Sequence, residues 1–267
     1  MNDPGSDLHR VRIRGLSHTY STAKAEVVAL RDIDLDVLDG EILCIVGPSG
    51  CGKSTLLNII AGFERPTIGE VLVHGAPVWE PGPDRVVVFQ ELGLFPWLTA
   101  RGNVEFGLKV RGVRKEDRRE VAERFMRMMH LEKFMDSLVH ELSGGMRQRV
   151  ALARALALNP DVLLMDEPFT ALDAQTRDHL HQELQEIWAR TRKTILFVTH
   201  NVREAVTLGH RVIVMTAQPG RIKKEFKVDL PRPRHIEDHA LIDVARAVIE
   251  ELRGEVAAVM KEEFRNE

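Results

Sequence analysis

Short apolar segments recur along the chain, each bounded by glycine, proline or polar residues. Residues 33–37 alternate between apolar and polar side chains, the pattern of a strand with one buried face. Continuous apolar runs, which predict further strands, occupy residues 42–46, 71–73, 86–89, 162–165, 194–198 and 212–215. The last three are short and bounded, as expected of strands covered on both faces of a sheet.

Helical periodicity appears between the later strands. Residues 174–192 keep Leu180, Leu184, Ile187 and Trp188 on one side, which predicts an amphipathic helix. Strands that alternate with helices in this way indicate an α/β core.

A middle segment, about residues 92–158, differs in composition, being rich in Arg, Met and Glu. Its amphipathic pattern runs through Val121, Phe125, Met128 and Met129, and it predicts an inserted helical subdomain. We interpret this Met and Phe stripe as ordinary core rather than a ligand site.

The C-terminal part begins where Pro231 and Pro233 end the last predicted strand, residues 222–230. A charged tail, residues 231–267, follows. Apolar residues recur in it at helical spacing, namely Leu241, Val244, Ala245, Val248, Leu252, Val256 and Val259. We expect one or two amphipathic helices that dock on the core, with a regulatory or dimerising role as the alternative.

Composition narrows the classes of function. The chain has 267 residues, 44% of them hydrophobic, which is enough for one large domain with an inserted subdomain. A net charge of −3 gives no basic face for nucleic acid, so no nucleic-acid partner is expected. The two cysteines, Cys44 and Cys51, imply no disulfide framework and suit a reducing cytosol.

No segment of the sequence suggests export or a membrane span. Residues 1–7 carry acids and no apolar core, unlike a signal peptide. No apolar stretch approaches the roughly eighteen residues that a membrane helix needs. We therefore expect any membrane role to act through a partner.

A phosphate-binding loop follows the apolar run 42–46 and opens a helical stretch. Its residues are Gly47, Pro48, Ser49, Gly50, Cys51, Gly52, Lys53, Ser54 and Thr55. Glycines let consecutive backbone N–H groups curl round a polyphosphate, and the helix N-terminus adds positive potential. Lys53 can reach the outer phosphates and Ser54 can hold Mg²⁺. The pattern predicts a nucleoside triphosphate site.

Two other segments carry candidate chemistry. Asp166 and Glu167 end a buried strand, so Asp166 can hold Mg²⁺ while Glu167 faces an attacking water; the alternative is two surface acids. Ser143, Gly144 and Gly145 precede a helix-forming run and resemble a second anion-binding helix start, although alone they would be an ordinary turn.

Together these segments resemble the ATPase subunit of ATP-binding cassette (ABC) transporters. The phosphate loop, residues 142–148, Asp166 with Glu167, residues 171–173 and His200 match that family in order and spacing, over residues 8–230. The resemblance implies a P-loop NTPase (RecA-like) α/β core with an antiparallel β subdomain and the inserted α-helical subdomain.

The resemblance also implies roles for single residues. Tyr20 matches an aromatic residue that stacks on adenine; packing at a sheet edge is the alternative. Gln90 matches a glutamine that touches Mg²⁺ and the attacking water. His200 matches a histidine that contacts the γ-phosphate and orders Glu167, and Asp173 matches an aspartate at a dimer interface.

In the family, two copies enclose two ATP molecules, because Ser143, Gly144 and Gly145 serve the nucleotide of the other copy. Gln148 of the same segment is included among the expected nucleotide-binding residues. The resemblance therefore implies a homodimer as well as ATP and Mg²⁺ as ligands.

The implied function is ATP hydrolysis that drives a separate transmembrane permease from the cytoplasmic face of the membrane. Residues 94–98 form an apolar loop that either receives the permease or is buried in the subdomain. Residues 95–97, 218–222 and 229–234 resemble the nitrate, sulfonate and taurine importers, which implies a periplasmic solute-binding protein as an indirect partner. The chain departs from that group's commonest form at Gln90 with Glu91, at Cys51 and in its long C-terminal helix, so specificity stays open.

Two alternatives differ in their support. A DNA-repair ATPase would need a long coiled coil between the phosphate loop and Ser143, where too few residues lie. An ABC ATPase of a non-import membrane complex, in lipid trafficking or cell division, stays open because its nucleotide site would be the same.

Overall fold

The computed structural model describes residues 9–21 and 25–266, with side chains up to residue 257. The expected start of the ATPase domain at residue 8 and the side chain of Val259 lie outside this part. None of the helices described is long and apolar enough to cross a membrane.

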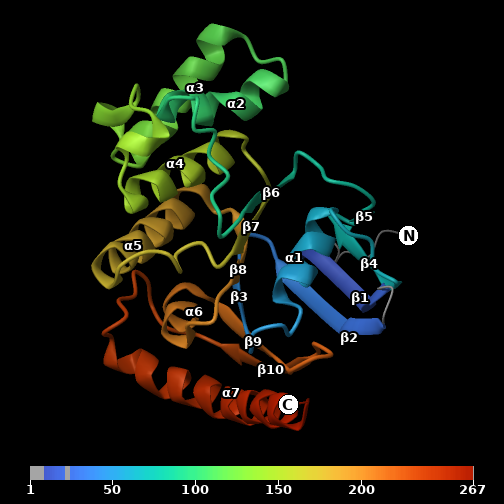
Figure 1. Cartoon of the computed structure of the whole chain (residues 1–267). Coiled ribbons are helices and arrows are strands. Elements are labelled where there is room, and N and C mark those ends of the chain that lie inside the picture. The colour runs from blue at the N-terminus through green and yellow to red at the C-terminus, as the bar shows by residue number, and fades with distance from the viewer. Residues whose placement is uncertain (1–8, 22–24, 267) are drawn as a thin grey trace.

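A six-stranded sheet forms the centre of the molecule (Figure 1). Its strands are β3 (Ile42–Val46), β6 (Arg85–Val88), β7 (Val162–Asp166), β8 (Thr194–Val198), β9 (Arg211–Met215) and β10 (Ile222–Lys227). The order is β10-β9-β3-β8-β7-β6, and only β10 runs antiparallel to its neighbour. The parallel strands carry their carboxyl ends to one edge, where the loops can form a site.

Both faces of this sheet are covered, as the apolar runs predict. In β3, Ile42 and Val46 belong to one hydrophobic cluster, whereas Leu43 and Ile45 belong to a second cluster on the other face. Every residue of β3 and β8 is buried. A strand buried on both sides needs apolar residues at every position, which explains the continuous runs.

A second sheet is antiparallel and packs on one side of the core with helix α1 (Lys53–Ala61) (Figure 1). Its strands are β1 (His9–Ser21), β2 (Glu26–Leu38), β4 (Ile68–Val73) and β5 (Ala76–Pro77), in the order β2-β1-β4-β5. In β2, Ile33, Leu35 and Val37 are buried, which confirms the alternating strand. Strand β1 has no counterpart among the apolar runs.

Three longer helices lie within residues 92–158, at one end of the molecule (Figure 1). They are α2 (Ala100–Val110), α3 (Lys115–Met128) and α4 (Gly144–Ala157), with the short helices η2 (Glu132–Phe134) and η3 (Val139–Glu141) between them. Phe125 and Met129 are buried in the large hydrophobic cluster, and Val121 and Met128 pack against it, which confirms that the stripe is core.

The remaining helices are α5 (Ala174–Thr191), α6 (Val202–Leu208) and α7 (His239–Asn266). Helix α5 lies beside α4, whereas α6 and α7 cover the other end (Figure 1). The tail forms the single helix α7, and its Leu241, Ala245 and Val248 are buried in the same cluster as α6 and β9, which confirms that it docks on the core.

The last strand is shorter than predicted. We expected it to span residues 222–230, but β10 ends at Lys227. Lys227 pairs with Arg211, the first residue of β9. Beyond this pair, Val228 N still donates to the carbonyl of His210, at 2.9 Å, but His210 lies before β9.

Candidate functional site

The loop between β3 and α1 has a backbone that only glycine accepts at critical positions. Gly50 and Gly52 have φ of +75° and +93°. A Cβ atom on Gly52 would lie 2.7 Å from Leu30 Cδ2 and 2.9 Å from the Ala29 carbonyl oxygen. The left-handed conformation and the close approach of β2 both require glycine there.

Lys53 is buried, with an exposed fraction of 6%, inside this loop. Its ammonium donates to the carbonyl oxygens of Gly47 and Pro48, at 2.9 Å each. Cys51 is also buried, with its Sγ 3.8 Å from Lys53 Nζ, and burial raises the pKa of its thiol. Lys53 therefore supplies the positive charge of the loop, whereas Cys51 packs beneath it.

A cavity of about 330 Å³ opens over the loop. Its lining residues are Tyr20, Val27, Ala29, Ser49, Gly50, Gly52, Lys53, Ser54, Thr55, Glu167 and Gln218. The structure thus brings Tyr20 and Glu167, predicted from distant parts of the sequence, to one cavity with the phosphate loop.

Asp166, at the end of β7, lies beside the start of α1. Burial raises the pKa of its carboxyl, and a hydrogen bond with Ser54 and the charge of Lys53 oppose that rise. A half-buried carboxylate next to a hydroxyl is a donor set that suits Mg²⁺, whose charge would favour the ionised form.

Glu167 follows in a strained conformation, with φ of +45° in a non-glycine residue. Its N–H donates to the Val198 carbonyl at 3.0 Å, and its Oε2 lies 2.8 Å from His200 Nδ1. Thr170 donates to the same oxygen at 3.2 Å. The structure therefore brings Glu167 and His200 together. Two side chains hold one oxygen of the carboxylate, and the bond to Val198 fixes the backbone.

Tyr20 lies at the end of β1, with a side chain about one-third exposed. Its hydroxyl donates to Glu64 Oε2 at 2.6 Å and lies 3.2 Å from Thr55 Oγ1. Burial and the bond to Glu64 raise the pKa of Tyr20. The hydroxyl is therefore fixed beside the phosphate loop.

Other predicted residues lie elsewhere in the same chain. Gln90, Gly144 and Gln148 line a second cavity of about 330 Å³, which shares no residue with the first. Ser143 caps α4, where its Oγ accepts from Met146 N at 3.3 Å. Gly145 allows α4 to approach α5, because a Cβ there would lie 2.7 Å from Thr176 Cγ2.

Asp173 caps the next helix, α5. Its carboxylate accepts from the N–H of Thr176 at 3.0 Å, and this bond lowers the pKa of Asp173. Asp173 and the start of α4 therefore do not meet the phosphate-loop cavity of their own chain, and neither does Gln90.

Sequence reasoning missed three residues of the first cavity. Val27 and Ala29 come from β2, and Gln218 comes from the loop between β9 and β10. Residues 218–222 stand out in the sequence only as a resemblance to an importer group. Nothing in the local pattern indicates that this loop reaches the phosphate loop.

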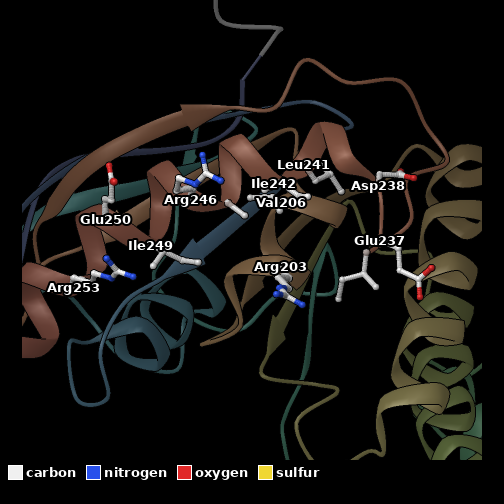
Figure 2. Close-up of a pocket in the computed structure, with 12 residues that line it drawn as sticks. Arg203, Val206, Glu237, Asp238, Leu241, Ile242, Arg246, Ile249, Glu250 and Arg253 are labelled. Atoms are coloured by element: carbon white, nitrogen blue, oxygen red, sulfur yellow. The ribbon is translucent and has the colours of Figure 1, made fainter.

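A larger cavity, of about 540 Å³, lies between α6 and α7 (Figure 2). Its apolar lining includes Val206, Leu241 and Ile249, and arginines and glutamates surround it. None of the predicted site residues lines it, so size alone does not identify the functional site.

The comparisons with known proteins agree with this geometry. The family model described as ABC transporter matches residues 30–170, from β2 through the phosphate loop to Glu167 and beyond. The chain belongs to the ABC transporter family.

Three relatives cover most of this ABC protein. An uncharacterised ABC transporter ATP-binding protein of Methanocaldococcus jannaschii is 48% identical over 252 residues, 94% of each chain. The nitrate import ATP-binding protein NrtD of Synechocystis is 48% identical over 83% of each chain. The taurine import ATP-binding protein TauB of Roseobacter denitrificans is 49% identical over 81% of each chain.

A solved structure is similar as well. The dimeric structure of an ATP-binding cassette in a post-hydrolysis state, bound to ADP and Pi, has a TM-score of 0.72 and 35% sequence identity. The match covers 83% of this chain and 100% of that one. These findings confirm the predicted ABC ATPase resemblance and fold class.

Proposed function

We propose that this ABC protein is the ATP-hydrolysing subunit of a solute importer. In this proposal it dimerises around ATP and drives a separate transmembrane permease from the cytoplasmic face of the inner membrane. The observation that carries the proposal is the cavity that joins the phosphate loop to the Glu167–His200 pair. Relatives named for nitrate and taurine import support the importer class.

The loop and its neighbours fit the two expected ligands. The backbone N–H groups of residues 49–55 and the Lys53 ammonium would bind the phosphates of ATP. Ser54 and Asp166 would hold Mg²⁺, with Gln90 as a further ligand in the closed dimer. When bound, Mg²⁺ neutralises charge that develops on the phosphate oxygens.

Glu167 would act on the attacking water. Its carboxylate faces the same cavity as Lys53, and His200 holds one of its oxygens at 2.8 Å. A base held in this way can orient water and accept its proton. His200, with an exposed side chain, would also reach the γ-phosphate.

A second copy would complete the site. The start of α4, with Ser143, Gly144 and Gly145, presents a helix N-terminus that serves no part of its own chain's phosphate cavity. Pairing two copies head to tail would bring this N-terminus to the partner's γ-phosphate. The solved structure of a dimeric ATP-binding cassette supports the pairing of two copies.

Tyr20 would stack on the adenine base. We expect Tyr20→Ala to weaken ATP binding about tenfold, because an aromatic platform contributes roughly 1–3 kcal/mol per base. Tyr20→Phe removes the bonds to Glu64 and Thr55 but keeps the ring, so it serves as the control. Equilibrium binding of a fluorescent ATP analogue measures both. If Tyr20→Ala binds ATP as tightly as the parent protein does, Tyr20 does not stack on adenine and only packs at the edge of the sheet.

The apolar loop 94–98 would dock on the permease. Phe95 packs against Phe106, with ring centroids 4.3 Å apart, whereas Trp97 is 72% exposed. The two interpretations of this loop thus apply to different side chains: Phe95 is anchored in the subdomain and Trp97 is available to a partner.

We expect Trp97→Glu to reduce recovery of the permease in affinity purification at least about tenfold, since a charge buried in an apolar contact is costly. Trp79→Glu is the matched control, because Trp79 is 62% exposed on another part of the surface. Quantitative mass spectrometry of the purified complexes measures the loss. Equal recovery with both variants would contradict the docking role.

Purification of the tagged chain from its native membranes tests the function itself. An importer subunit should bring down an integral permease, and its ATPase activity should respond to a periplasmic solute-binding protein. The relatives favour nitrate, taurine or a similar sulfonate as the transported solute. If a cell-division or lipid-trafficking complex is recovered instead, the importer assignment is wrong, but the assignment of ATPase activity still holds.

A further inference from the structure

The loop that joins β9 to β10 is packed tightly on the nucleotide-binding side. Gly220 N donates to the Ala29 carbonyl, and Arg31 N donates to the Gly220 carbonyl, both at 2.9 Å. A Cβ on Gly220 would lie 2.0 Å from the Cys51 carbonyl oxygen. The loop therefore rests directly on β2 and on the phosphate loop.

This loop places Gln218 in the phosphate-loop cavity, together with Tyr20 and Lys53. The loop is closed internally, because Thr216 Oγ1 donates to the Pro219 carbonyl and accepts from Arg221 N, at 2.9 Å each. Gln218 itself is exposed, and its amide can both donate to and accept from the polar groups of a nucleotide.

Helix α7 holds the same loop from its other side. Glu255 Oε2 accepts from Ala217 N at 2.8 Å, and its Oε1 lies 2.9 Å from Lys223 Nζ. One turn earlier, the Glu251 carboxylate pairs with Lys224 at 2.7 Å. Glu255 thus contacts the chain on both sides of Gln218: at Ala217, directly before it, and at Lys223, near the start of β10.

We propose that α7 is part of the nucleotide site, with Gln218 as a nucleotide-contacting residue and Glu255 as its positioning residue. By holding Ala217, Glu255 keeps the loop in the position that aims Gln218 into the cavity. This inference rests on the proposed function, since it assumes that the cavity binds ATP and ADP.

The arrangement predicts a specific kind of effect. Loss of Glu255 leaves the Ala217 N–H without its charged acceptor and loosens the backbone next to Gln218, although the bonds of Gly220 and Thr216 still hold the rest of the loop. Lys53 and Glu167 keep their own contacts. Nucleotide affinity should fall while hydrolysis of bound ATP continues. A helix that only stabilised the fold would not separate these two quantities.

ADP binding to the full-length chain tests the proposal, because it needs no closed dimer. We expect Glu255→Ala to weaken binding of a fluorescent ADP analogue about fivefold, within the range of couplings carried by contact networks. Glu255→Gln keeps an acceptor for Ala217 N and should recover most of the affinity. Glu250→Ala, on the same helix but outside the loop contacts, should bind as the parent protein does.

Two further measurements sharpen the result. In a Gln218→Ala background, Glu255→Ala should cause no further loss of ADP affinity, because both changes remove the same contact, that of Gln218 with the nucleotide. In steady-state ATPase assays, KM for ATP should rise by the same factor as the ADP dissociation constant, with kcat unchanged.

Three outcomes would overturn the proposal: unchanged ADP affinity in a folded Glu255→Ala protein, losses that add fully to those of Gln218→Ala, or an equal loss in Glu250→Ala. Thermal unfolding checks the fold. If the Glu255→Ala protein unfolds, Gln218→Ala, which changes an exposed side chain, tests the same contact through its own loss of ADP affinity, and unchanged affinity there likewise overturns the proposal. A parent protein that binds no ADP would instead refute the proposed function together with this inference.

Discussion

Replacing Glu167 by glutamine is expected to lower ATP turnover at least about a hundredfold while ATP binding is kept, since a positioned general base typically contributes about 10²- to 10⁴-fold. The glutamine has nearly the same shape and can still accept from Thr170, so the local geometry should persist. It cannot accept a proton from water. Phosphate release measures turnover, and equilibrium binding of ATP measures affinity.

The same variant should accumulate as a dimer with Mg²⁺ and ATP, because the closed state no longer decays by hydrolysis. Light scattering coupled to gel filtration detects that dimer. Glu225→Gln is the matched control: Glu225 pairs with Arg211 at the start of β9, neither residue lines the cavity, and turnover should stay unchanged. If Glu167→Gln turns over ATP at the parent rate, Glu167 is not the general base.

Replacing Ser143 by aspartate is expected to reduce turnover about 10²- to 10³-fold, the usual effect of losing one preorganised donor at a developing charge. Aspartate caps a helix as well as serine does, so the bond from Met146 N should be retained and α4 should stay folded. Its negative charge, however, would face the γ-phosphate held by the partner copy. ATP binding to the isolated chain should not change.

The control for this variant makes the same chemical change at another helix. Thr99 caps α2 by accepting from Gly102 N, so Thr99→Asp alters a cap away from the phosphate cavity. Phosphate release and ATP-dependent dimer formation should both be lost only in Ser143→Asp. If Ser143→Asp still forms the ATP dimer and hydrolyses ATP normally, the head-to-tail pairing is wrong.

The local pattern predicted the central strands well because a doubly covered strand leaves a continuous apolar signal, as in residues 194–198. It failed where pairing decides the outcome. The last strand was overextended to residue 230, although its partner ends the pairing at Lys227. Strand β1 went unrecognised because the alternation that starts with Val11 and Ile13 breaks at Gly15, where the pairing with β2 shifts its register before Leu16.

The candidate site likewise contains residues that the sequence predicts and contacts that only the fold creates. The phosphate loop and the pair Asp166 and Glu167 are contiguous in sequence, and their chemistry follows from residue type next to a strand. The contact of Glu167 with His200 joins residues 33 positions apart, so its 2.8 Å distance could be seen only in the folded chain. The expected roles of Gln90 and Asp173 stay predictions about the dimer.

By itself, the sequence of this ABC protein determined the fold class, the phosphate loop and the acidic pair, because each depends on the types and spacing of residues that are neighbours in the sequence. Only the tertiary structure decided that Gln218 enters the same cavity and that Glu255 holds the loop that carries it. Those contacts join strands, a loop and a terminal helix that are far apart in the sequence. Their energy depends on long-range packing, which produces no periodic pattern of apolar and polar residues.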